Sequence, residues 1–351
     1  MTARPDATLT SAAGRGAPRA DRVSARSLES LALVLGASGF VVGGLAAVSV
    51  FRLSATPIAG PGSIGQFAAL ASAVVALVCV GAGRYLLSQR AHERLRLLDH
   101  LDIAALAIAC AVVGMLGWTL LAAILAEAFV GAHVFPVAVV ILGGAAAAVT
   151  AYASFWSSAE MDTRRLAMLL VTFFVVGVLA ATLSTSDPDW WKDNLSALGV
   201  TTNASARAFN LTLVFSGFLI TSLARSATKL TREDMSGQVR VRICLVILGV
   251  LLALVGVFPV DLFWLIHVAV SLGMLIAFGV LIAGLPRWMP GLARPFLTLG
   301  WVFLALLVMA GVFYAVGYYT LTAVELIGGA LIFTWVVLFI RNTAALEEDA
   351  S

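Results

Sequence analysis

The sequence predicts an all-α, polytopic membrane protein of about ten transmembrane helices with both termini in the cytoplasm. Of its 351 residues, 61% are hydrophobic and 12% are charged, whereas a soluble domain carries about 25% charged residues. Ten stretches are apolar over roughly the 20 residues that a helix needs to cross the hydrocarbon layer. These stretches are 31–51, 66–88, 102–127, 134–156, 165–185, 206–224, 241–259, 262–284, 296–318 and 322–340.

The distribution of basic residues predicts the orientation of these spans. All but three of the 22 Lys and Arg residues fall in the terminal tails and alternate loops that a cytoplasmic N-terminus would place inside. Only Arg52, Lys192 and Arg207 fall on the outer side. Basic residues mark cytoplasmic loops, so we expect a multi-pass protein of the inner (cytoplasmic) membrane.

Several classes of function find no support in the residues. No water-facing segment carries the clustered Lys and Arg that nucleic-acid binding needs. Cys79, Cys110 and Cys244 lie inside apolar runs without CxxC spacing, so neither a zinc site nor a disulfide framework is expected. No Asp, Glu, Lys or Arg falls near the centre of a span, which argues against a proton-coupled pump. We therefore expect no metal and no cofactor.

The densest polar and aromatic run is DPDWWKDNLSALG at 187–199, in the longest outer loop. Asp187 followed by Pro188 is typical of a helix start. Trp190 and Trp191 would then lie on a short helix at the head-group level, as interfacial anchors. In the alternative interpretation the same loop is a lid, whose Lys meets a phosphate while the Trp pair touches acyl chains.

Polar residues of the outer side form a candidate ligand-binding set, because they share one side of the membrane and a similar depth. The set is Lys192, Asp193, Ser196, Arg207, Asn210, Asp261 and His267. Local roles remain open for its members, such as turn bonds in the loop and an N-cap for Asp261. Thr322 and Glu325 show the T-x-x-E spacing of a capping box, which would explain them at the start of the last span.

His267 is expected to face the protein interior, because hydrocarbon penalises a polar ring exposed to lipid. Asn210 is its expected partner by depth, and such a pair could simply hold two helices together. Asp261 and His267 cannot pair along one helix. Six residues turn about 600°, which leaves the two side chains about 120° apart around the helix axis. A metal-free arrangement of Ser196, His267 and Asp261 is a further alternative.

Four short motifs carry a family resemblance: an outer-loop S-x-L-G, an F-N entering the next span, an F-P-x-D, and a His shortly after it. They are Ser196, Leu198 and Gly199; Phe209 and Asn210; Phe258, Pro259 and Asp261; and His267. With these motifs, residues 165–341 resemble the bacterial domain-of-unknown-function family 998. That family is distantly similar to the DRAM and Sfk-type membrane proteins, which are linked to lipid remodelling or leaflet asymmetry. The resemblance implies a six-span module with a lipid-related role.

The resemblance also predicts how the chain is divided. The expected parts are a disordered cytoplasmic tail (1–29), a four-span N-terminal part (30–160), the six-span module (161–342) and a short cytoplasmic tail (343–351). The first part is rich in Arg, Ala, Pro and Ser, a composition that buries too little apolar surface to order itself.

We expect a protein that binds lipid head groups in an outer-leaflet polar pocket and acts in envelope or lipid homeostasis without hydrolysing its ligand. Membrane lipids are the expected partners, and other envelope proteins are a second class of partner. One alternative is a secondary transporter whose spans divide five and five. Another is a membrane-embedded lipid hydrolase or transferase that uses Ser196.

Overall fold

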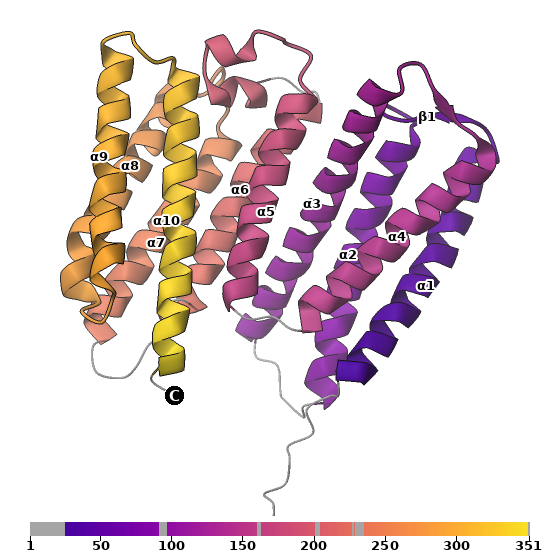
Figure 1. Ribbon diagram of the computed structural model, residues 1–351, viewed down its shortest axis with the longest axis horizontal. Helices are drawn as coiled ribbons and strands as arrows, with labels where there is room; N and C mark the ends of the chain where they lie inside the picture. Colours follow the sequence, from indigo (N-terminus) through magenta and orange to yellow (C-terminus); the bar gives the residue numbers. More distant parts are fainter. Residues whose placement is uncertain are drawn as a thin grey trace, which may run out of the picture.

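The computed structural model describes residues 25–90, 97–159, 163–200, 204–226, 228 and 235–349. Within this part of the chain ten α-helices run side by side across the molecule (Figure 1). They are α1 (Ala25–Phe51), α2 (Ile64–Arg90), α3 (Leu97–Ala128), α4 (Pro136–Ala159), α5 (Thr163–Leu183), α6 (Ala204–Ser226), α7 (Met235–Val257), α8 (Trp264–Trp288), α9 (Arg294–Ala315) and α10 (Leu321–Asp349). Each predicted span coincides with one helix apart from a few residues at the ends, so the all-α fold is confirmed. Most of the predicted tail at 1–29 lies outside the described residues.

Nine of the described helices are long and apolar enough to cross a membrane, and the polytopic class is therefore confirmed. The remaining helix, α5, has a shorter described apolar stretch, Ala167–Leu183. The helix itself runs from Thr163 to Leu183 and therefore begins and ends two residues before the predicted span at 165–185. The orientation of the termini and the four-part division of the chain remain predictions.

The helices form two neighbouring groups, α1–α4 and α5–α10, with α3 standing next to α5 (Figure 1). In the first group α1 packs on α4, and α2 packs on both α3 and α4. In the second group α6 packs between α5 and α7, while α10 packs on α5 and α9. The start of α1 and the end of α10 lie at the same edge of the molecule, as an even number of crossings requires.

A small two-stranded ribbon joins two connections of the first group. Strand β1 (Thr56–Pro57) pairs antiparallel with β2 (His133–Val134), which links the α1–α2 connection to the α3–α4 connection. This ribbon and the α5–α6 connection lie at the same edge of the molecule (Figure 1), which we call the loop end.

Small residues let the helices approach closely. A Cβ added at Gly43 of α1 would lie 2.5 Å from the Ala147 Cβ and 2.9 Å from the Gly143 carbonyl oxygen of α4. The backbones of α1 and α4 are therefore in direct contact, which is the packing mode that small residues provide in membrane helices.

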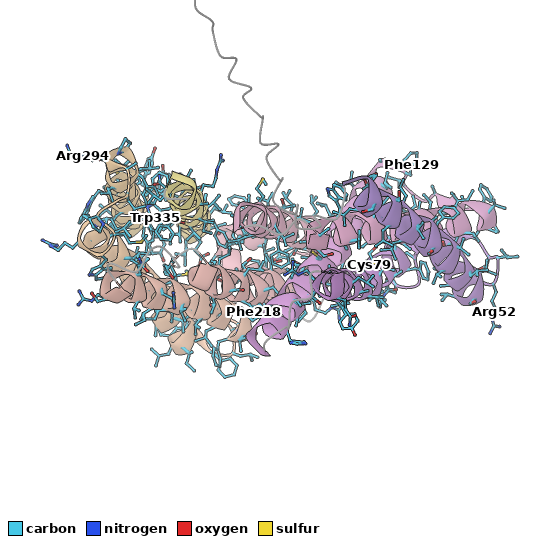
Figure 2. All side chains as sticks on the ribbon, turned by 90° about the horizontal axis from the view of Figure 1, so that it is seen from below. Arg52, Cys79, Phe129, Phe218, Arg294 and Trp335 are labelled. Carbon is cyan, nitrogen blue, oxygen red and sulfur yellow. The ribbon has the colours of Figure 1, made fainter. Side chains whose placement is uncertain are left out.

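The second group is packed around Trp335 of α10, which is fully buried. Its ring stacks on Phe296 and Phe339 and meets Phe278 edge-on, with ring centroids 5.2, 5.5 and 5.4 Å away. Aromatic pairs in such geometries contribute about 0.5–1.5 kcal/mol beyond the area that they bury. Figure 2 shows Trp335 between the helices of this group, whereas Arg294 and Arg52 lie at opposite ends of the long axis.

Candidate functional site

The connection between α5 and α6 folds over the loop end and contains two short 3-10 turns, η1 (Trp190–Lys192) and η2 (Leu195–Gly199). Asp187 begins this arrangement, because its Oδ1 accepts the N–H of Asp189 at 2.9 Å. Such a bond to the backbone two residues on is characteristic of Asx turns. The predicted continuous short helix is thus replaced by two separate turns.

A side chain from another helix caps η2. The N-cap residue of this turn, Asn194, makes no side-chain capping bond. Instead, the N–H of Leu195 donates to Glu325 Oε2 of α10 at 2.5 Å, and the N–H of Ser196 also bonds to this carboxyl group. The first N–H groups of a helix have no partner within it, and Glu325 supplies one from outside.

Thr322 holds η1 in the same way, because its Oγ1 donates to the carbonyl oxygen of Trp191 at 2.7 Å. The capping-box interpretation of Thr322 and Glu325 is therefore wrong. Thr320 accepts the N–H of Ala323 at 3.3 Å at the start of α10. Since residues three apart share one face of a helix, the Thr322 and Glu325 side chains reach the loop together.

His267 lies in the first turn of α8 and is 4% exposed. Its Nδ1 is 2.7 Å from the carbonyl oxygen of Phe258, and its Nε2 is 3.0 Å from Ser196 Oγ. A carbonyl oxygen only accepts hydrogen bonds, so Nδ1 carries the ring hydrogen. In the neutral ring, Nε2 then accepts the hydroxyl hydrogen of Ser196. His267 thus ties η2 to the α7–α8 connection.

The predicted pairing of Asn210 with His267 is wrong. Asn210 Nδ2 of α6 donates to the carbonyl oxygen of Gly199 at 3.0 Å, and a Cβ at Gly199 would collide with the same amide group. Both side chains nevertheless bind η2, one at each of its ends. Because α8 begins at Trp264 rather than at 262, His267 is shallower than expected and lies level with the loop.

Four members of the predicted ligand-binding set lie at the surface. They are Lys192, Asp193, Arg207 and Asp261. Lys192 Nζ lies 2.8 Å from Asp189 Oδ1 and 5.7 Å from the ring centroid of Trp191. The Lys192 and Asp189 side chains are 56% and 64% exposed, so water screens this ion pair and its contribution to stability is small.

Asp261 neither caps α8 nor pairs with His267. The N-cap of α8 is Phe263, so the N-cap interpretation of Asp261 is wrong. The ring nitrogen of His267 that would face a carboxylate faces the Phe258 carbonyl instead. The three-residue arrangement of Ser196, His267 and Asp261 is therefore reduced to its Ser–His pair.

The two tryptophans of the loop differ in burial. Trp190 is half-buried and packs against the core of the second helix group. Trp191 is 49% exposed and is therefore the more accessible of the two rings. The interfacial-anchor role of both residues remains a prediction.

The structure therefore brings Ser196 and His267 into contact, places Asn210 at the other end of η2, and leaves the charged candidates at the surface. The sequence reasoning missed Glu325 and Thr322 as residues that hold the loop. Asn194 was expected to make local turn or cap bonds, but its buried Oδ1 has no hydrogen-bond partner within the described part of the chain. The i, i+3 spacing of the Thr–Glu pair was a usable signal, but a local capping box explained it equally well.

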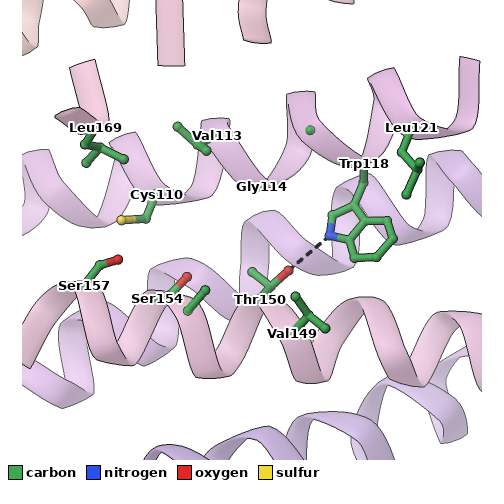
Figure 3. A pocket seen from close by; sticks show the side chains of 12 residues that line it. Cys110, Val113, Gly114, Trp118, Leu121, Val149, Thr150, Ser154, Ser157 and Leu169 are labelled. Carbon is green, nitrogen blue, oxygen red and sulfur yellow. Dashed lines mark hydrogen bonds between the residues drawn. The ribbon is translucent and has the colours of Figure 1, made fainter. Parts of the chain in front are cut away.

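A cavity of about 330 Å³ lies in the first helix group, lined by α3, α4 and Leu169 of α5. A short polar chain borders it: Trp118 Nε1 donates to Thr150 Oγ1 at 3.2 Å (Figure 3), and Thr150 donates to Ser72 at 3.0 Å. The rest of the lining is mostly apolar. Among the described residues, no three His, Cys, Asp or Glu side chains gather closely enough to hold a metal ion.

Comparison with known proteins identifies the second half of the chain. The family model described as "Protein of unknown function (DUF998)" matches residues 168–342, the region that contains α5–α10 and the four motifs. No curated protein and no solved structure matches the chain, so the likeness to the DRAM and Sfk-type proteins stays a prediction. Through residues 168–342 the chain belongs to the DUF998 family, and it is an integral membrane protein of unassigned activity.

Proposed function

We propose that this protein binds lipid head groups at the outer face of its own membrane and acts in envelope or lipid homeostasis. The proposal rests on one observation, the loop fastened over the helix ends. Side chains from three helices bind it: Asn210 from α6, His267 from α8, and Thr322 and Glu325 from α10. A connection that only had to cross between two helices would not need such fastening.

The fastened loop presents groups suited to a phospholipid. Trp191 and Lys192 are exposed side by side, and Arg207 is exposed one helical turn before Asn210. An aromatic ring of this kind prefers the head-group level, and Lys and Arg bind phosphate through charge-assisted hydrogen bonds. The weak, exposed Lys192–Asp189 pair can open to admit a phosphate.

No feature of the described residues specifically favours the transporter alternative. Carriers bind substrate near the bilayer midplane, whereas the ionisable groups of this site gather at the loop end of the helices. We therefore do not propose transport.

The test uses a phospholipid that carries a photoactivatable diazirine in its head group. The protein is reconstituted in vesicles, irradiated, and its cross-linked peptides are mapped by mass spectrometry. We expect cross-links on 187–199 and the start of α6 to exceed those on the β1–β2 ribbon, which lies at the same loop end. The variant pair Lys192→Ala with Arg207→Ala should reduce the signal several-fold.

Arg52→Ala is the matched control, because it removes an exposed cation from the loop end of the first helix group. Its cross-linking at 187–199 should equal that of the unmodified protein. Equal cross-linking of the loop and the ribbon, or an unchanged signal in the double variant, would count against head-group binding at this site.

A further inference from the structure

The hydrogen bond between Ser196 and His267 has the direction that nucleophilic catalysis requires. The Phe258 carbonyl fixes the ring hydrogen on Nδ1, which leaves the Nε2 lone pair to accept the serine hydroxyl hydrogen at 3.0 Å. A serine becomes a nucleophile when an adjacent base takes its proton and a third group orients the base. Here the third group is a backbone carbonyl.

A second observation distinguishes this pair from a simple helix-to-loop contact. Asn194, two residues before Ser196, has a buried side-chain oxygen with no hydrogen-bond partner among the residues that the structure describes. Leaving such a group unpaired costs about 1–3 kcal/mol, and buried polar groups nearly always have partners. An unpaired amide oxygen two residues before the serine is suited to accept a hydrogen bond from a hydroxyl or ammonium group of a substrate.

The depth of the pair indicates the substrate class. His267 lies about 4.5 Å past the start of α8, at 1.5 Å per residue. The residues around that start are strongly exposed and apolar: Leu262 is 72%, Trp264 64% and Leu265 72% exposed. Trp rings prefer the membrane–water interface, and the ester carbonyls of a glycerolipid lie just beneath its head groups.

We propose that Ser196 is the nucleophile and His267 the general base of an acyl-ester-cleaving site, and that its substrate is a carboxylic ester of an outer-leaflet membrane lipid. This inference rests on the proposed function, because head-group binding at the loop brings the ester to the pair. The protein would then bind the lipid and also cleave its ester bond.

The reaction proceeds in two steps, acylation of Ser196 and hydrolysis of the acyl-serine. Ser196 Oγ bonds to the ester carbonyl carbon while its proton passes to His267 Nε2, and the ester C–O bond then breaks as the alcohol leaves with that proton. Water next attacks the acyl-serine and gives its proton to His267. The fatty acid leaves, and the proton returns to Ser196.

The site is closed in this structure, since Ser196 is 7% and His267 is 4% exposed. The neighbouring turn η1 is bound by Thr322 through the Trp191 carbonyl oxygen and by the packing of Trp190 against the core. In the proposed opening η1 moves away and loses both contacts, while Glu325 continues to hold η2. Loops that close over a reacting centre behave in this way in many enzymes.

The experiment measures covalent labelling of the full-length protein in vesicles by a fluorophosphonate, which forms a bond to an activated serine as fluoride leaves. Peptide mapping should find the adduct on Ser196. His267→Gln should lower the labelling rate by about 100-fold or more, the usual contribution of a general base. Glutamine can still hydrogen-bond Ser196 and keep the loop in place, so a purely structural role would leave the rate unchanged.

Ser205→Ala is the matched control. Ser205 is a buried serine whose hydroxyl donates to the Ala181 carbonyl oxygen, and its removal should leave labelling intact. A second arm follows fatty acid released from vesicles of phosphatidylethanolamine and phosphatidylglycerol, which should vanish in Ser196→Ala. Thermal unfolding of each variant confirms that it is folded.

The outcomes separate this inference from the proposed function. Without Ser196 labelling or fatty acid release, but with head-group cross-linking still confined to the loop, the catalytic inference is overturned and lipid binding survives. Labelling of Ser196 with evenly spread cross-links overturns a lipid ester as the substrate together with the proposed function. Labelling that persists in His267→Gln overturns the role of His267.

Discussion

The two helix groups differ most at the loop end. In α1–α4 the connections are held by the β1–β2 backbone ribbon and by local bonds, such as that from the Gly62 N–H to Gln66. In α5–α10 one connection is held by side chains from three helices, and it contains a serine in contact with a histidine. Polar side chains near hydrocarbon are expensive, and their concentration at one place is why the candidate site is located in the second group.

Within the helix bundles the two groups are alike, because in both of them the helix backbones approach closely. Gly43 of α1 meets α4, and Gly217 of α6 meets the backbone of α7 at Gly249. Packing by small residues is therefore common to both groups and does not distinguish them, whereas the contacts at the loop end do.

Orientation gives the largest expected effect, an all-or-none result. Lys192→Cys should react with a membrane-impermeant maleimide in intact spheroplasts, because the excess of basic residues predicts that the opposite edge is cytoplasmic. Arg240→Cys, also at an exposed position, should react only after lysis. The native Cys79, Cys110 and Cys244 are buried and should contribute little background. The reversed pattern would place the loop in the cytoplasm and remove the outer leaflet from the proposal.

Close packing in the first group gives the next largest effect. Gly43→Ala places a Cβ against the Ala147 Cβ and the Gly143 carbonyl oxygen, and overpacking of this kind costs about 1–3 kcal/mol. Gly81→Ala is the control, because its Cβ meets nothing within 4 Å and alanine favours a helix by about 1 kcal/mol. The midpoint of thermal unfolding in detergent should therefore fall for the first variant and stay the same or rise for the second. Equal midpoints would mean that α1 and α4 are not in backbone contact.

Fastening of the loop gives a smaller but more local effect. Glu325→Ala removes the acceptor of the Leu195 and Ser196 N–H groups and should cost about 1–3 kcal/mol. Hydrogen exchange of these two amides should accelerate, whereas the helix amides of α3 should stay protected. Glu127→Ala, an exposed carboxylate at the loop end of α3, should change neither quantity. Unaltered exchange at 195 and 196 would show that Glu325 does not cap η2.

The sequence was informative about everything that repeats along the chain. Apolar runs placed most helix ends to within a few residues, and the polar run at 187–199 marked the segment that carries the candidate site. Partner choice could not be read in the same way. Depth along a helix made Asn210 the expected partner of His267, but depth says nothing of helix rotation, and the ring meets Ser196 instead.

Glu325 shows the second reason for incomplete prediction. Its spacing from Thr322 fits a local cap, and the same spacing also places both side chains on one face toward a distant segment. Because a local cap was enough to explain this spacing, the sequence offered no reason to expect a contact with the distant loop. Only the fold decides, since Thr320 already serves the start of α10 and frees the pair to hold the loop.

The exposed tryptophan gives the smallest effect on stability and the sharpest contrast between the groups. Trp191→Ala removes a ring that is 49% exposed but keeps the carbonyl oxygen that binds Thr322. The free energy of unfolding should therefore change by no more than about 0.5 kcal/mol. Head-group cross-linking at 187–199 should nevertheless fall. Phe135→Ala, with a ring 75% exposed beside the β1–β2 ribbon, should leave that signal unchanged. A stability loss well above this value, with cross-linking intact, would make Trp191 a packing residue and confine the lipid contact to Lys192 and Arg207.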